Sequence, residues 1–476
     1  MKAGIRFFLC HPVKTILHES ERLFMQIQIF FAKLQYRSIR NLKRDTQKGA
    51  VCLLKNKLIQ ILQRVFSSLK HKEFRYFWFG QCISLIGTWM QRTAQVWLVY
   101  TMTNSPFMVG MVGVCQFTPI LLFTLFAGAL VDRFSKRNIL LMTQSALMIQ
   151  AIVLTLLAYF DMLQYWHILL LSILLGLTQT FDMPARQSFF IELVGRGDIM
   201  NAVSLNSTIV NLAKIIGPAL SGIVMVNFGN IYCFSINAIS FFAVLLSLLY
   251  IKASPKKFIR EQQKVMQEVK DGLCYIKQSK ALMINIMFMA IICTFAMNND
   301  VIIPVFAKSV LGLGAAAYTA LMSAAGIGAF IGAIFMAFRA EKGVEKRFFL
   351  FCLSATALLQ VLMFFVANYN AAFLCIACIG FLNLAFMNMG NSIFQLNADG
   401  EHRGRVMSVY SFLNQGSTPV GNFYAGTAME YLGGLWGFPL CGIAAVGLLG
   451  IIFIYERQEL FRWIHDKKQA DEKISL

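Results

Sequence analysis

The chain has 476 residues, of which 57% are hydrophobic and only 14% are charged. This composition excludes an ordinary water-soluble domain, in which about 25% of residues are charged. The formal net charge is +20, but the Lys and Arg residues lie between long apolar stretches and form no single patch, so nucleic acid is not expected as a partner. The eleven cysteines are scattered, and the close pair Cys375 and Cys378 has no His or acidic residue beside it. We therefore expect neither a metal site nor a cofactor.

A basic segment, residues 1–70, precedes the first long apolar stretch. It carries fourteen Lys/Arg residues and lacks an uninterrupted apolar run long enough to cross a membrane. It contains one apolar face at helical spacing, as in a helix that lies on an anionic membrane surface, made by Leu54, Leu58, Ile61, Leu62 and Val65. Two interpretations stay open: a cytoplasmic amphipathic extension, or a translation start further along, for example at Met25.

Twelve apolar stretches follow, each close to the roughly 20 residues that cross a membrane as a helix. They lie near residues 76–101, 107–131, 138–160, 164–184, 204–226, 230–251, 281–306, 316–338, 348–367, 371–394, 408–432 and 435–455. The loops after the even-numbered stretches hold nineteen Lys/Arg residues, whereas the other five loops hold one, Lys308. Because Lys and Arg are retained in the cytoplasm, the sequence predicts a multi-pass protein of the cytoplasmic (inner) membrane with both termini in the cytoplasm.

The longest polar interruption, residues 252–280, divides these stretches into six plus six. It separates a first half, 71–251, from a second half, 281–455, and a cytoplasmic tail follows at 456–476. Apolar residues recur in this linker at helical spacing, which predicts an amphipathic helix on the inner membrane surface: Val265, Val269, Leu273 and Ile276. Short matches at an offset of about one half, such as Ser188-Phe189-Phe190 and Ser392-Ile393-Phe394, indicate a duplication. The predicted fold is all-α, with two six-helix pseudo-repeats around a central cavity.

The loop after the second stretch opens with a glycine and an acid and closes with basic residues. It reads Gly128-Ala-Leu-Val-Asp132-Arg133-Phe-Ser-Lys136-Arg137. This resembles motif A of the major facilitator superfamily, with Ser135 where the family often has glycine and Met336 where the second copy would have its acid. The resemblance implies that Asp132 sits against the N-terminus of the eleventh helix, where free N–H groups favour an anion. Asp132 would then latch the two halves together on the cytoplasmic side.

The fourth stretch ends Thr180-Phe-Asp182-Met-Pro184-Ala-Arg186. This order places Asp182 near the same cytoplasmic surface as Arg133. Two interpretations stay open: Asp182 pairs with Arg133 as part of the gate, or it is an independent interfacial acid that helps to end the helix.

The fifth stretch reads Asn211-Leu-Ala-Lys214-Ile-Ile-Gly217-Pro218-Ala-Leu-Ser221-Gly222. It resembles motif C, the glycine–proline pattern of exporters and antiporters in the same superfamily, with Ala213 and Ser221 where glycine is usual. Glycine permits close helix contact and proline bends a span. Further phrases around Gly80–Gln91, Phe181–Gln187 and Arg403–Ser408 resemble the transmembrane secretion effector branch over about residues 70–455. Members of that branch are linked to siderophore or drug export, so the resemblance leaves the cargo open.

Ionisable groups inside a membrane are costly, so each is a candidate for function. The sequence offers Arg92, Lys214, Asp300 and Glu430. The two cations would attract an anionic cargo or neutralise an acid across the cavity. Asp300 is either the proton-coupling acid, because desolvation favours its neutral form, or a residue of a wet outer vestibule that hydrogen-bonds the neighbouring asparagines. For Glu430 we favour an interfacial residue that reaches the lipid headgroups. Gln91 is a candidate for lining the cavity.

The chain contains no G-x-x-x-x-G-K-[ST] phosphate loop and no paired His/Asp or nucleophile arrangement in a suitable context, so we expect neither an ATP-driven pump nor an enzyme. We expect a monomeric secondary transporter, surrounded by membrane lipid, that exports a small molecule in exchange for protons. Two alternatives stay open: ion-coupled uptake, and a non-transporting sensor with the same fold.

Overall fold

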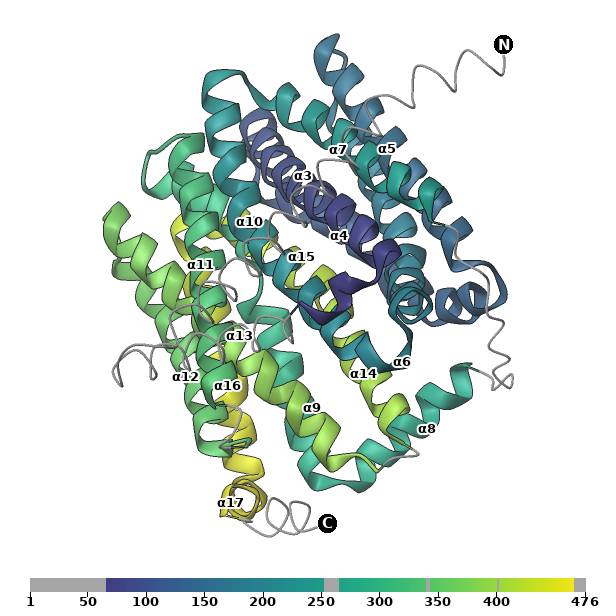
Figure 1. The fold of residues 1–476 in the computed structure, drawn as a ribbon. Helices are drawn as coiled ribbons and strands as arrows, with labels where there is room; N and C mark the ends of the chain where they lie inside the picture. The colour runs from purple at the N-terminus through teal and green to yellow at the C-terminus, as the bar shows by residue number, and fades with distance from the viewer. Residues whose placement is uncertain (1–65, 252–264, 340–342, 400–401, 466–476) are drawn as a thin grey trace, which may run out of the picture.

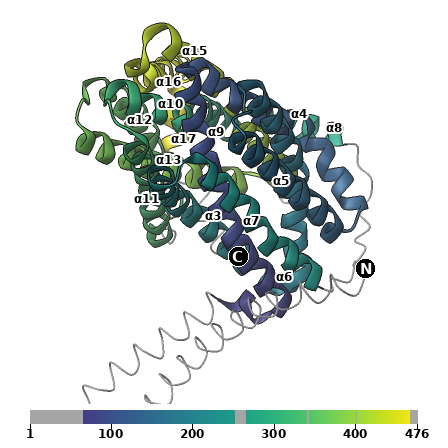
Figure 2. The ribbon, with the colours of Figure 1, turned by 90° about the horizontal axis from the view of Figure 1, so that it is seen from above.

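The computed structural model describes residues 66–251, 265–339, 343–399 and 402–465, and within these ranges it contains helices and no strands (Figure 1). The predicted amphipathic face at 54–65 and most of the predicted tail lie outside the described residues. Figures 1 and 2 show α3, α5 and α7 gathered on one side of the molecule and α11, α12 and α13 on the other. We call α3–α7 the first group and α9–α16 the second group.

The first group begins after a short 3-10 helix, Ser67–Lys70. Its helices are α3 (Lys72–Thr103), α4 (Pro106–Arg133), α5 (Lys136–Tyr159), α6 (Tyr165–Asn227) and α7 (Asn230–Tyr250). The start of α4 follows from its sequence, because the Ser105 hydroxyl accepts a hydrogen bond from the Met108 N–H and Pro106 occupies the first helical position. The 63-residue α6 is two spans joined at Gly195, whose φ of 71° is a conformation that glycine adopts without strain.

The second group contains a broken span. Its helices are α9 (Lys280–Ile291), α10 (Asn299–Val305), α11 (Ala315–Arg339), α12 (Lys346–Leu362), α13 (Tyr369–Asn397), α14 (Arg403–Gly416), α15 (Thr418–Leu432) and α16 (Gly437–Tyr455). Between α9 and α10 the chain forms a π-helix, Ile292–Ala296, and then leaves helical geometry at Met297 and Asn298. A second π-helix, Phe306–Val310, follows α10. Such breaks free backbone carbonyl groups, and the Ala296 carbonyl accepts hydrogen bonds from the buried Gln360 and Asn383 amides.

Ten helical segments of the described chain are long and apolar enough to cross a membrane. The predicted stretches 76–101 and 408–432 are helical but are not among these ten. The first corresponds to α3, which carries three glutamines and Arg92, and the second is divided at Ser417 between α14 and α15. The count of twelve spans and the two six-helix repeats therefore stay predictions.

The linker contains the expected helix, α8 (Val265–Gln278). It packs on the start of α14: Asp271 lies 3.7 Å from Arg405, and the Tyr275 ring stacks on the N-cap residue His402 at 4.4 Å between centroids. The tail begins with one more helix, α17 (Arg457–His465), whose Trp463 packs against Phe349 of α12. Both short helices thus lie against the second group, and their place on a membrane surface stays a prediction.

The apolar core is shared between the groups at one end of the molecule and divided at the other. We call the end of the bundle where Lys and Arg residues gather at the helix ends the basic end; these residues include Arg133, Lys136, Arg137, Lys346 and Arg405. At the basic end, one buried cluster takes its residues from 69–251 and a separate cluster takes its residues from 276–463. At the other end of the bundle, which we call the opposite end, a single cluster joins residues of both groups, among them Trp97, Val301, Tyr318 and Phe438.

Candidate functional site

A salt bridge joins the two groups near the middle of the bundle. The Arg92 guanidinium of α3 donates to the Asp300 carboxylate of α10, and the two side chains are 26% and 30% exposed. Asp300 lies in the first turn of α10, directly after the break in its span. Of the two functions considered for Arg92, the structure shows the neutralisation of an acid on the other group.

Aromatic rings and a second cation surround this salt bridge. The Arg92 guanidinium lies 5.1 Å from the centre of the Trp89 ring and 5.4 Å from that of Phe117. Lys214 of α6 lies over the same Trp89 ring, with its Nζ 5.6 Å from the centre. These cation–π contacts favour positive charge at the site. Two cations thus lie near one carboxylate, and the cluster carries a surplus of one positive charge when all three are ionised.

The glycine of the motif C pattern places Lys214 at this cluster. A Cβ on Gly217 would lie 2.5 Å from the Trp89 Cβ, so glycine at this position lets α6 approach α3 closely. Lys214 lies one helical turn before Gly217 and therefore reaches the face of the Trp89 ring. The neighbouring Pro218 is buried.

Tyr318 of α11 closes the cluster toward the opposite end. It is fully buried, its ring stacks on Trp97 at 5.2 Å between centroids, and its hydroxyl donates to the Thr93 carbonyl at 3.3 Å. Because Trp97 and Thr93 belong to α3, these contacts bind the second group to the first. No feature of the sequence marks Tyr318 as functional, because it lies in an otherwise ordinary apolar span.

Gln91 lies away from the charged cluster, although it is the neighbour of Arg92. Its side chain is 4% exposed, donates to Gln150 at 3.1 Å and accepts from Asn237 at 2.7 Å. These partners belong to α5 and α7, so Gln91 connects helices inside the first group. The structure does not place it on the cavity side with Arg92, since consecutive helical residues point about 100° apart.

The basic residues of the motif A loop hold the ends of helices in their own group. Lys136 donates to the Val131 carbonyl at 2.9 Å, and Arg137 donates to the Leu248 carbonyl at 2.7 Å. Both contacts place a cation at a helix C-terminus, where carbonyl groups lack helical partners. Arg133 is exposed, and the space beside Gly128 is open. The side chain of Asp132 lies outside the described residues.

Asp182 is buried inside the first group and has partners other than Arg133. Its carboxylate pairs with Arg186 and accepts from Thr143 at 2.8 Å and Gln144 at 2.7 Å. Arg186 lies one turn further along α6 and also donates to Gln81. The considered pair with Arg133 was therefore wrong, because a closer cation is available at the i,i+4 position, a spacing that the sequence displays.

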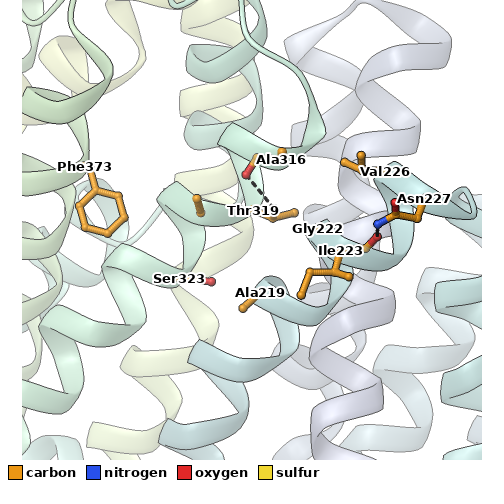
Figure 3. Close-up of a pocket in the computed structure, with 10 residues that line it drawn as sticks. Ala219, Gly222, Ile223, Val226, Asn227, Ala316, Thr319, Ser323 and Phe373 are labelled. Carbon is orange, nitrogen blue, oxygen red and sulfur yellow. Dashed lines mark hydrogen bonds between the residues drawn. The ribbon is translucent and has the colours of Figure 1, made fainter.

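Glu430 and Gly222 both lie toward the opposite end. The Glu430 carboxylate accepts from the Ser105 hydroxyl and the Phe107 N–H of the first group. Gly222 lines a mainly apolar cavity of about 400 Å³ between α6, α11 and α13, opposite Thr319 (Figure 3). A Cβ on Gly222 would collide with the Thr319 hydroxyl, so this glycine permits contact between the groups. The cavity lies apart from the charged cluster.

Comparison with solved structures defines the class of fold. A bacterial homolog of the human lysosomal transporter Spinster, in an inward-facing and unoccupied conformation, aligns with a TM-score of 0.63 at 11% identity over 83% of this chain and 98% of its own. A mutant of the peptide transporter POT aligns with a TM-score of 0.67 at 13% identity over 82% and 95%. The chain thus shares the fold of these membrane transporters.

Sequence comparison gives the family. The model of the transmembrane secretion effector family matches residues 63–474. The staphyloferrin A transporter of Staphylococcus aureus is 24% identical over 81% of this chain and 96% of its own length, and the multidrug efflux pump Tap of Mycolicibacterium fortuitum is 23% identical over 75% and 89%. The chain belongs to the transmembrane secretion effector family of the major facilitator superfamily. It is a multi-pass membrane transporter and not an enzyme.

Proposed function

We propose that this protein exports a small molecule across the cytoplasmic membrane in exchange for protons, by alternating access around the Arg92–Asp300 cluster. The observation that carries the proposal is the salt bridge itself, because it joins the two groups at a point where a bound cargo or a bound proton would change its charge balance. The motif C pattern at Gly217 and Pro218 and the efflux pumps among the relatives support export. We take the basic end as cytoplasmic, with both termini on that side and the transporter acting as a monomer.

The division of the core supports alternating access. A core shared between the groups at the opposite end and separate cores at the basic end are what a transporter needs when it is closed to the outside and able to part on the cytoplasmic side. In the other state of the cycle, Asp132 would latch the cytoplasmic end against the N-terminus of α14, as the resemblance to motif A implies.

Asp300 is the proposed proton site. Its ionised form binds Arg92, and a proton on the carboxyl group removes the charge that holds this pair together. Protonation would therefore loosen the connection between α3 and α10 and leave both Arg92 and Lys214 without an acid nearby. Proton binding and movement of the groups are coupled through this one contact.

Exchange requires that cargo and proton exclude each other. A cargo competes with the proton when it places a cation, or several N–H donors, against the ionised Asp300 carboxylate. We propose a cargo with such a group, carried on an apolar or aromatic body that contacts Trp89 and Phe117.

Ion-coupled uptake is the second candidate, and the surplus positive charge of Arg92 and Lys214 favours it. An anionic cargo bound to these two cations would stabilise the protonated form of Asp300, so that cargo and proton would travel in the same direction. The charge of the cargo thus decides between the two candidates.

Transport into everted membrane vesicles with an acidified lumen tests the proposal, using a panel of fluorescent organic cations and anions as probes. We expect cations to accumulate, and Asp300→Asn to reduce that accumulation more than tenfold, a loss of the order of one hydrogen bond between charged groups. The matched control is Asp161→Asn, which changes an exposed acid in the loop between α5 and α6. Accumulation that survives collapse of all ion gradients and requires ATP would refute the proposal, and anions that move together with protons would establish uptake.

A further inference from the structure

Glu430, which belongs to the second group, contacts the N-terminal end of α4 in the first group. It lies near the end of α15, and its Oε2 accepts from the Ser105 hydroxyl at 2.7 Å and from the Phe107 N–H at 3.1 Å. The Ser105 hydroxyl in turn accepts from the Met108 N–H at 3.2 Å. The carboxylate thus completes the cap of α4, which differs from the headgroup contact expected from the sequence.

The position suits a negative charge. The first four N–H groups of a helix lack helical partners, and α4 is 28 residues long, so its N-terminus carries the positive end of a long helix dipole. Phe107 is the second residue of α4, and its N–H therefore belongs to this unpaired set. A carboxylate from another helix accepts a hydrogen bond from this N–H group, and the positive end of the helix dipole stabilises its negative charge.

A lysine of the second group holds the preceding loop residue. Lys308 donates to the Asn104 side-chain oxygen at 2.7 Å and lies 5.2 Å from the centre of the Tyr100 ring. Asn104 ends α3 in the left-handed conformation, with φ of 50°. Residues 104–107 of the first group are therefore held by Glu430 and Lys308 from two separate elements of the second group.

These contacts need the helices to lie close together. A Cβ on Gly426, one turn before Glu430, would lie 3.0 Å from the Pro106 carbonyl oxygen and 3.2 Å from the Gly110 Cα. Glycine there lets α15 approach the start of α4. Any separation of the two groups at this end would break the hydrogen bonds that Glu430 accepts and Lys308 donates, because a hydrogen bond is lost within about 1 Å of added distance.

We propose that Glu430 is the lock of the opposite end: its charge, held at the α4 N-terminus, stabilises the conformation in which this end is closed. Lys308 secures the same loop beside it. The inference rests on the alternating access of the proposed function, but it concerns the conformational equilibrium and does not depend on the identity of the cargo or of the proton site.

Distance measurement between spin labels tests the lock in the full-length protein. The labels replace Tyr159 of α5 and Phe365, which follows α12; both are exposed, lie at the opposite end and belong to different groups. Labels carried on noncanonical aromatic residues leave the native cysteines in place. We expect Glu430→Gln to raise the ratio of long to short distances about two- to fivefold, as the loss of one charge at a helix N-terminus predicts.

Three further variants complete the design. Glu430→Asp keeps the charge and should recover much of the short-distance population, whereas Asp161→Asn removes an exposed acid at the same end and should leave the distances unchanged. Ser105→Ala removes one of the two donors and tests the lock if Glu430→Gln is poorly folded. Distances in Glu430→Gln and Ser105→Ala that match the unmodified protein would overturn the inference.

Discussion

The two ends of the molecule differ in how the helical groups meet. At the opposite end, Trp97 stacks on Tyr318 from the other group, and the hydrogen bonds that Glu430 accepts and Lys308 donates cross the same boundary. At the basic end, Phe77 packs with Phe189 and Phe190 inside the first group, and Phe349 packs with Phe386 inside the second. These aromatic contacts of the basic end therefore survive when the groups part.

This difference separates two kinds of buried residue. A residue of the shared core contributes to the choice between conformations, because its contacts exist only when the opposite end is closed. A residue of a divided core contributes equally to every conformation of its group. Burial alone does not distinguish the two, since Tyr318 and Phe349 are both fully buried.

The largest expected effect comes from truncating one residue of each kind. Phe349→Ala should lower the free energy of unfolding by about 3–5 kcal/mol without changing the conformational equilibrium, because the lost packing lies within one group. Tyr318→Ala should in addition open the opposite end, raising the long-distance population of the Tyr159–Phe365 label pair by about tenfold, as expected for a lost stack and hydrogen bond. Thermal unfolding and spin-label distances measure the two effects. Equal distance shifts in both variants would break the distinction between shared and divided cores.

How far the sequence predicted the site depends on the kind of signal. The phrases around Gly80–Gln91, Phe181–Gln187 and Arg403–Ser408 predicted the transmembrane secretion effector family, which comparison confirmed. The i,i+4 spacing of Asp182 and Arg186 in the sequence is typical of a salt bridge on one face of a helix, which is what the structure contains. Gln91 shows the limit: helical periodicity tells which residues share a face, but the rotation of α3 about its axis depends on packing with α5 and α7. A polar residue in a membrane span satisfies either a cavity or a neighbouring helix, and sequence alone does not separate these.

Contacts between distant segments were the other limit. The sequence placed Arg92 and Asp300 in separate spans and offered their pairing as one option, which the structure realises. It offered no sign that Glu430 would meet Ser105, because the two are 325 residues apart and neither belongs to a motif. The two π-helices, Ile292–Ala296 and Phe306–Val310, were not predicted either: the first has an ordinary apolar sequence, and the second, which contains Lys308, fell mostly in a predicted loop.

A smaller effect is expected at the basic end. If Asp132 latches that end in the other state of the cycle, Asp132→Asn should favour its opening by about 0.3–1 kcal/mol, because the amide loses the charge that a helix N-terminus stabilises. Labels at Met200 and Phe338, both exposed and on different groups, report the distance. The shift is best measured in the Glu430→Gln background, where the basic end closes more often. Asp132→Glu, which keeps the charge, should have a weaker effect, and an unchanged distance in Asp132→Asn would reject the latch.

The smallest net effect is expected when both acids are neutralised together. Glu430→Gln weakens closure at the opposite end, and Asp132→Asn weakens closure at the basic end. Each variant alone therefore shifts the equilibrium between the two conformations by about 0.3–1 kcal/mol, and the two shifts have opposite signs. The two positions lie at opposite ends of the bundle, and distant substitutions add to within about 0.3–0.5 kcal/mol. The double variant should therefore return both label pairs close to the distances of the unmodified protein. If Glu430→Gln instead acted by damaging the local fold of α4, the second substitution would not restore the Tyr159–Phe365 distance, and the double variant would resemble Glu430→Gln alone.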